Sequence, residues 1–122
     1  MAGVVHIPWY ATGFRHNKLA DGLAGIAPVA LRYGARSYQV HRFRDDLYKF
    51  LQIAEFDSKR DFDRYWHGPE FTDFRVLASS WYQVPVMYGW TDIVAAGTLE
   101  PEEAVHASRG LEDAAPPGDL AG

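Results

Sequence analysis

The chain has 122 residues, of which 48% are hydrophobic, 23% charged and 15% aromatic, with a formal net charge of −4. That length suits one domain with its own core. The acidic balance disfavours a nucleic-acid partner, because phosphates are neutralised by clustered Lys and Arg. Cysteine is absent, which excludes disulfides, thiolate catalysis and Cys-ligated metal. No apolar run approaches about 18 residues and no signal segment opens the chain, so we expect a cytoplasmic protein without a membrane partner.

The first third of the chain has the pattern of a strand followed by a helix. Residues 4–10 alternate apolar and polar side chains and predict a strand, in which Pro8 indicates a bulge or an unpaired position because it has no N–H. Apolar residues at helical spacing then predict a helix. We expect Asn17 to cap it, Pro28 to kink or restart it, and Gly34 to end it in a left-handed conformation.

Two further strands are predicted next, over residues 35–43 and 47–56, joined by an acidic turn at residues 44–46. The second of these strands is mostly apolar on both faces, which is typical of a central strand.

A second helix follows, with Asp57 or Ser58 as its N-cap and an interruption at Gly68-Pro69. Residues 83–94 alternate again and predict the last strand. We therefore expect a folded domain over residues 1–96.

Residues 97–122 are rich in Pro, Gly, Ala and acidic side chains, and they predict a solvated C-terminal tail. Within it, residues 101–109 begin with proline and acids at first-turn positions, which favours a short helix there.

The order strand, helix, strand, strand, helix, strand predicts a ferredoxin-like α+β fold. In that fold both helices cover one face of a four-stranded antiparallel sheet. The other face then needs cover, because a central strand with apolar residues on both sides does not leave one face wet. We therefore expect a homodimer in which two sheets face each other across an isologous interface.

Residues 27–74 resemble the antibiotic biosynthesis monooxygenase-like family, whose members are dimeric α+β barrels of ferredoxin-like topology. The resemblance extends over residues 4–94. The positions that carry it are Gly34, Tyr38, Asp46, Phe50, Phe56, Pro69 and Phe71.

The resemblance implies an enzyme of a family that includes cofactor-independent oxygenases of aromatic polyketides, haem-degrading enzymes, isomerases and proteins with no assigned reaction. The family's usual polar positions differ in this chain. Tyr65 stands where a helix histidine is common, Ala54 where a strand glutamate is common, and Glu70 where a histidine often follows the proline. Any chemistry is therefore expected to use a different arrangement.

His6, His41 and Tyr82 are the candidate catalytic residues. A histidine near neutral pKa can remove a phenolic or enolic proton, so that the resulting carbanion-like substrate donates an electron to O₂. We expect His6 or His41 to be that base and Tyr82 to donate a hydrogen bond. The alternative is that each histidine is a structural or surface residue.

Aromatic residues are in excess, which predicts an aromatic-lined pocket or interface. In the pocket interpretation a flat ligand lies in a slot between helices and sheet, and in the alternative the same rings are plain core. Arg75 is a candidate to hold a carboxylate or enolate, or else a surface ion-pair residue beside Asp73. The predicted substrate-binding residues are Tyr65, Trp66, His67, Trp81, Trp90 and Arg75.

We expect no cofactor and no metal. His67 and Glu70 are separated by the helix break at Gly68-Pro69, which spoils a shared metal geometry. Haem ligation by Tyr65 is the remaining cofactor alternative.

The leading functional hypothesis is a small cofactor-independent enzyme that carries out a monooxygenase-type oxidation of an aromatic or polyketide-like substrate with O₂. One alternative is a non-catalytic dimeric barrel that binds a hydrophobic small molecule or assists a partner enzyme. The other is an isomerase or cyclase on the same scaffold.

Overall fold

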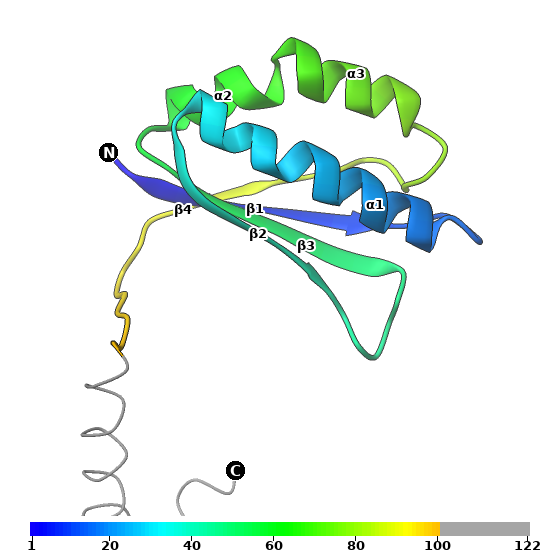
Figure 1. The fold of residues 1–122 in the computed structure, drawn as a ribbon, viewed down its shortest axis with the longest axis horizontal. Coiled ribbons are helices and arrows are strands. Elements are labelled where there is room, and N and C mark those ends of the chain that lie inside the picture. Colours follow the sequence, from blue (N-terminus) through cyan, green and yellow to red (C-terminus); the bar gives the residue numbers. More distant parts are fainter. Residues whose placement is uncertain (101–122) are drawn as a thin grey trace, which may run out of the picture.

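The computed structural model describes residues 1–100 of the chain. The elements in chain order are β1 (Gly3–Tyr10), α1 (His16–Ile26), the 3₁₀ helix η1 (Ala27–Tyr33), β2 (Ala35–Arg42), β3 (Lys49–Phe56), α2 (Lys59–Trp66), α3 (Pro69–Leu77) and β4 (Gly89–Thr91). The sheet order is β2-β3-β1-β4 with antiparallel neighbours. The helices of residues 1–100 all cover one face of the sheet (Figure 1). The predicted ferredoxin-like α+β fold is confirmed, and β3 is a central strand.

Local signals fix several of the element boundaries. Ser58 is the N-cap of α2, and its side chain accepts a hydrogen bond from the backbone N–H of Asp61 at 3.2 Å. Gly34 ends η1 at φ 98°, a left-handed conformation that glycine adopts without steric cost. Pro28 lies at the start of η1, where α1 gives way to the tighter helix. The cap prediction for Asn17 is wrong, because α1 begins at His16 and Arg15 is the capping position.

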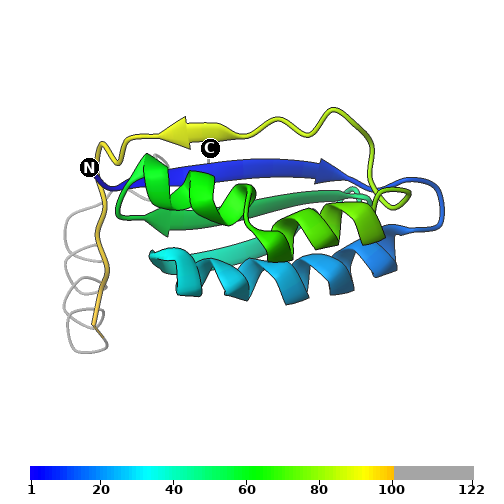
Figure 2. The ribbon, with the colours of Figure 1, turned by 90° about the horizontal axis from the view of Figure 1, so that it is seen from above.

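The last strand is much shorter than predicted. Only Gly89–Thr91 forms β4, and it pairs with β1 no further than His6. Pro8 lies beyond that point and has no N–H for a longer pairing. Of the two alternatives predicted at Pro8, the bulge is absent, since β1 and β3 stay in register through the Pro8–Leu51 pair, and the unpaired position is present on the side of β4. Residues 83–88 instead form an irregular connection along the β1 edge of the sheet (Figure 2).

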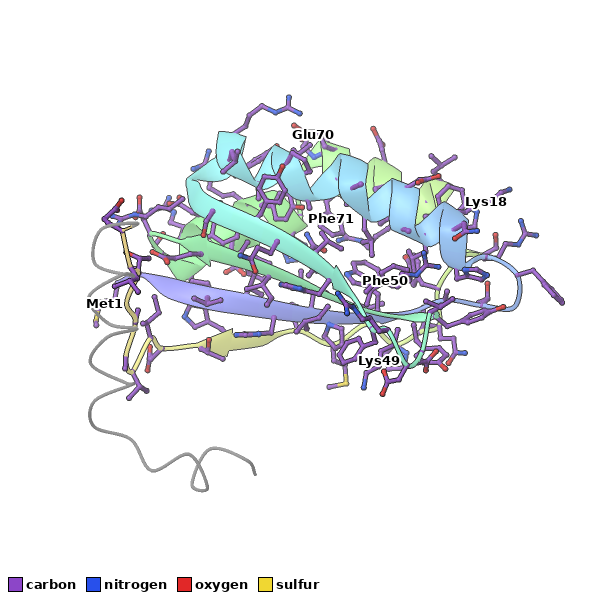
Figure 3. All side chains as sticks on the ribbon, turned by 60° about the horizontal axis from the view of Figure 1, so that its bottom comes forward. Met1, Lys18, Lys49, Phe50, Glu70 and Phe71 are labelled. Atoms are coloured by element: carbon purple, nitrogen blue, oxygen red, sulfur yellow. The ribbon has the colours of Figure 1, made fainter. Side chains whose placement is uncertain are left out.

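The core lies between the helices and the sheet. Phe71, labelled in Figure 3, extends from α3 toward the sheet and is fully buried. A chain of hydrogen bonds crosses this core. The indole N–H of Trp9 donates to Gln52 Oε1 at 3.1 Å, Gln52 Nε2 donates to the Tyr65 hydroxyl at 3.1 Å, and that hydroxyl donates to the Ile26 carbonyl at 2.7 Å. The buried amide of Gln52 is thus partnered at both ends, so it ties β1 and β3 to α2 and the end of α1.

The other face of the sheet has no helix over it within residues 1–100 (Figure 1). Its side chains alternate with those of the core along the same strands: His6 pairs with Ile53, and Leu51 pairs with both Pro8 and His41. We call this surface the open face. It combines half-buried apolar side chains with two histidines.

Within residues 1–100 no helix is long and apolar enough to cross a membrane. The helix predicted over residues 101–109 lies outside the described residues. The proposed division into residues 1–96 and 97–122 stays a prediction.

Candidate functional site

Arg75 on α3 has a partly buried guanidinium group that lies among aromatic side chains. Its guanidinium carbon lies 4.6 Å from the centroid of the Trp66 ring and 5.1 Å from that of Phe71. Tyr82 lies beside it, with a long 3.5 Å contact from its hydroxyl to the Arg75 carbonyl, and the Tyr82 ring packs edge-on against Trp9 at 4.9 Å. We call Trp9, Trp66, Phe71, Arg75 and Tyr82 the Arg75 cluster. It joins β1, α2, α3 and the segment after α3.

The guanidinium is only partly satisfied. Nη1 of Arg75 is buried and makes no hydrogen bond to any residue in the described part of the chain. Burial lowers the pKa of Arg75 below its ordinary value, and nearby Tyr82 opposes that shift. An arginine nevertheless stays protonated in a protein. The cluster therefore holds a positive charge whose natural complement is an anion.

Tyr82 is the titratable partner of this charge. Burial raises the pKa of Tyr82 above its ordinary value, while the positive charge of Arg75 acts in the opposite direction. At neutral pH the hydroxyl is therefore protonated and able to donate a hydrogen bond, and its role as a donor to a substrate stays a prediction. The structure thus brings together three of the predicted site residues, Trp66, Arg75 and Tyr82.

The ion pair considered for Arg75 with Asp73 does not form among the described residues, because α3 directs Arg75 inward over the Trp66 ring. Trp66 itself is half-buried. Its ring meets that of Tyr88, in the segment leading to β4, at 5.4 Å. The exposed edge of the cluster therefore lies beside residues 83–88.

Tyr65 lies deeper than a pocket wall. It is 1% exposed, and its hydroxyl both accepts from Gln52 and donates to Ile26. Burial raises the pKa of Tyr65 well above its ordinary value. A neutral phenol with both hydrogen bonds made has a packing role here, and the expected slot for a flat ligand is filled by aromatic side chains at this point.

The two candidate bases lie on the open face, away from the Arg75 cluster. His6 is half-buried on β1, and His41 is exposed on β2, where its Nε2 is 2.8 Å from Gln39 Oε1. The sheet separates both histidines from Arg75, because the side chains of Trp9 and His6 alternate to opposite faces of β1. One small substrate therefore cannot contact Arg75 and either histidine within one protomer.

The remaining predicted residues are dispersed. His67 is exposed at the C-cap of α2. Trp90 on β4 stacks on Phe62 with ring centroids 6.3 Å apart. Trp81 is half-buried on the outer side of the helices and lies under the ammonium of Lys18 at 5.9 Å. The structure does not bring these three side chains together.

Three surface hollows are each lined by at least one of the residues described above. One of about 660 Å³ lies between α1 and α3 and includes Trp81. A second, of about 620 Å³, lies at the end of the open face and includes His6 and Glu55. The third, of about 290 Å³, lies between β1 and residues 83–87 and includes Trp9. Trp9 is the member of the Arg75 cluster that lines the third hollow.

The next question is whether the described residues could bind a metal ion or a haem. No group of three or more His, Asp or Glu side chains in residues 1–100 is arranged to hold a metal ion. Tyr65, the residue considered for haem, is enclosed by its own hydrogen bonds.

Trp9 and Gln52 were not singled out by the sequence reasoning. Trp9 contacts four other aromatic rings, and Gln52 is the buried polar residue of the core. A signal was present for Gln52, since a lone amide on an otherwise apolar face of a central strand indicates a buried polar partner.

Solved structures with the same fold give an external comparison. Rv0793 from Mycobacterium tuberculosis is similar with a TM-score of 0.70 at 14% identity, over 80% of this chain and 100% of its own. SnoaB from Streptomyces nogalater, described as a cofactor-independent oxygenase, is similar with a TM-score of 0.67 at 16% identity, over 78% and 95%. A proposed antibiotic biosynthesis monooxygenase from Nitrosomonas europaea has a TM-score of 0.69 at 11% identity, over 79% and 94%.

Another protein from Nitrosomonas europaea, NE2512, is described as being of unknown function and has a TM-score of 0.68 at 18% identity, over 82% and 97%. No protein-family model and no curated protein matches the chain. At these identities the likeness establishes the fold. This is the fold of antibiotic biosynthesis monooxygenase-like proteins, as the sequence resemblance implied.

Proposed function

We propose that this protein is a cofactor-independent oxygenase of a small aromatic phenol or enol, and that the Arg75 cluster holds the substrate's oxyanion. The observation that carries the proposal is the buried Nη1 of Arg75, which has no hydrogen-bond partner among the described residues. A buried donor without a partner costs about 1–3 kcal/mol, more when charged, and an anionic ligand would recover that free energy. The described solved structures of the same fold include one named as a cofactor-independent oxygenase, which supports the choice of reaction.

The proposed step begins with loss of a proton from an anthrone-like substrate. Arg75 stabilises the enolate. The Tyr82 hydroxyl, which donates to the Arg75 carbonyl at a long 3.5 Å in the structure, turns from that carbonyl to give the enolate a second hydrogen bond. The proton leaves to solvent, because His6 and His41 lie across the sheet. The Arg75 guanidinium lies over the ring of Trp66, so a flat substrate packs against the exposed edge of this half-buried ring.

Oxygen then reacts with the bound enolate. The enolate carbon transfers one electron to O₂, and the resulting radical and superoxide combine into a C–O bond. Protonation gives a hydroperoxide, which loses water as the carbon becomes a carbonyl. One oxygen atom of O₂ thus enters the product and the other leaves as water, so no external reductant is needed.

A homodimer fits the same proposal. The open face carries half-buried Val4, Leu51 and Ile53 with no helix over them in the described residues. A second copy of the chain facing this surface would remove these side chains from water.

The test is oxygen uptake with anthrone and no added cofactor. We expect Arg75→Met to lower kcat/KM by about 10²–10³-fold, because it removes a charge from the developing oxyanion while its methylenes still pack on Trp66. Arg60→Met is the matched control on α2: Arg60 is exposed, and this variant should keep full activity. His6→Ala and His41→Ala should also retain turnover. If either histidine variant lost activity while Arg75→Met kept it, the proposal would be wrong, and that histidine of the open face would be the base.

The second candidate is a non-catalytic barrel that binds a hydrophobic small molecule. It is favoured by the aromatic filling of the interior, where Trp9, Phe71 and Phe74 contact one another. In that case the anthrone would bind, and its binding would depend on Arg75, but no oxygen would be consumed.

A further inference from the structure

The two longest helices enclose a groove that the proposed oxidation does not use. The helices α1 and α3 lie side by side over the sheet (Figure 2), and a hollow of about 660 Å³ opens between them. Neither Arg75 nor Trp66 lines it. Its apolar lining is Ile26, Phe74, Leu77 and Trp81.

Two glycines at i,i+3 on α1 shape this groove. A Cβ on Gly22 would come within 2.9 Å of the Phe74 ring and 3.1 Å of the Trp81 ring, so Gly22 is required for close packing. Gly25 differs, because a Cβ there would meet nothing within 4 Å. Glycine disfavours a helix interior, and packing gives no reason for it at this position. The space beside the Cα of Gly25 is part of the groove.

The charged groups of the groove are predominantly acidic. Asp21, Glu70 and Asp73 contribute three carboxylates against the single ammonium of Lys18. Glu70 accepts a hydrogen bond from Tyr33 at 2.6 Å, and this bond is the main cause of its lowered pKa. Figure 3 shows Glu70 and Lys18 well apart along the helix layer.

The carboxylates of Asp21 and Asp73 differ from that of Glu70, because they make no hydrogen bond or ion pair with any residue in the described part of the chain. An apolar groove with unpaired carboxylates at its rim complements a molecule that is itself apolar and positively charged. The half-buried indole of Trp81 adds a ring face, and ring faces attract both flat aromatic bodies and cations.

We propose that the α1/α3 groove binds a small aromatic amine. Its flat body lies along Trp81, Phe74 and Leu77, and its ammonium group is attracted by Asp21 and Asp73. The site is on the outer side of the helices, so it remains open when the open face of the sheet is covered. It is separate from the Arg75 cluster, whose charge selects the opposite kind of ligand.

The test uses two probes of similar shape and opposite charge, tryptamine and indolepropionate, titrated into the full chain and followed by amide NMR. We expect tryptamine to shift the amide signals of Gly22 and Gly25 and the indole N–H of Trp81. The expected Kd is about 1 mM or tighter, which is ordinary for a ligand of this size. Indolepropionate should bind at least about tenfold more weakly, and added salt should weaken the tryptamine complex.

Variants locate the site. Gly25→Leu fills the groove without a clash, since nothing lies near its Cβ, and it should raise the tryptamine Kd by tenfold or more. Asp21→Asn and Asp73→Asn should each raise it several-fold. Asp45→Asn, an exposed acid of the β2–β3 hairpin, and Arg75→Met should leave it unchanged. Far-UV circular dichroism and the melting temperature confirm that Gly25→Leu stays folded.

The proposal is overturned if tryptamine does not shift these signals at millimolar concentration, or if indolepropionate binds equally well. It is also overturned if Gly25→Leu is folded and binds tryptamine with unchanged affinity.

Discussion

On the helix side of β1 and β3, Trp9 and Gln52 are buried and fully partnered, whereas on the other side His6, Leu51 and Ile53 remain half-buried. Both sets come from the same two strands and alternate residue by residue. On the helix side the side chains are held by ring contacts and hydrogen bonds. Among residues 1–100, the buried side-chain group there without a hydrogen-bond partner is Nη1 of Arg75. The side chains of the helix-covered face are thus packed within residues 1–100, whereas the open face leaves its apolar side chains half-exposed.

Trp9→Ala is expected to have the largest effect. It removes a ring that contacts Trp66, Phe71, Phe74 and Tyr82, and it leaves Gln52 Oε1 without its donor. We expect a loss of about 3–5 kcal/mol in the free energy of unfolding, measured by urea denaturation.

The matched change on the open face is Leu51→Ala. At low protein concentration it should cost about 1 kcal/mol or less, because Leu51 is already partly in water in the single chain. Equal losses for Trp9→Ala and Leu51→Ala under those conditions would contradict the contrast between the two faces.

Tyr65→Phe tests the hydrogen bonds of the covered face. Gln52 Nε2 loses its acceptor and the Ile26 carbonyl loses its donor, so we expect a loss of about 2 kcal/mol. Tyr38→Phe is the control, because Tyr38 is an exposed tyrosine on β2, and it should change stability by less than about 0.5 kcal/mol.

The same variant has a pH signature. Burial raises the pKa of Tyr65, so in the folded state it keeps its proton at pH values where the unfolded chain, with a tyrosine pKa of about 10, has released it. The stability from this difference is fully present below pH 10 and is lost as the pH rises further. Tyr65→Phe should therefore show a shallower fall of stability above pH 10. An unchanged slope would mean that Tyr65 does not titrate on unfolding in this range.

Ile53→Lys tests the dependence of the open face on a second copy. A lysine at this position would place a charge in the proposed sheet-to-sheet interface, and we expect the dimer dissociation constant to rise by at least tenfold in sedimentation equilibrium. The monomer fold should survive, because Ile53 does not face the core. A wild-type chain that is monomeric at high concentration would exclude the dimer.

His41→Ala is expected to have the smallest effect. His41 is exposed and contacts only a neighbouring amide on its own strand, Gln39, among the hydrogen bonds of the described residues. The change in unfolding free energy should be within about 0.5 kcal/mol by urea denaturation. A larger loss at low concentration would show that the open face is stabilised within the chain.

The sequence predicted most of the elements because their signals are local. Ser58 as a cap, Gly34 as a left-handed helix end and the two-faced apolar pattern of β3 each act within a few residues. Alternation also placed His6 opposite the apolar side chains of β1. It could not say which face the helices cover, and so it could not separate the histidines from the other candidates.

The Arg75 cluster was only partly predictable. Trp66 and Arg75 are nine positions apart, on two helices whose relative direction is set by the break at Gly68. No helical spacing connects residues across such a break, and the contact of Trp9 with Tyr82 depends on how residues 79–83 turn back to β1. The length of β4 was also mispredicted. Residues 83–88 carry an alternating apolar pattern, but in the structure they form no strand.

The most direct test of the central role of Arg75 is the pKa of anthrone bound to the protein without oxygen. Under nitrogen, ionisation of the bound substrate can be followed by the visible absorption of its enolate while oxidation is prevented. If Arg75 holds the oxyanion, the wild-type protein should lower the pKa of bound anthrone by about one to two units, as expected for a charge-assisted hydrogen bond. Arg75→Met should abolish the shift. A bound anthrone whose pKa is unchanged in the wild type, or equally lowered in Arg75→Met, would contradict the account.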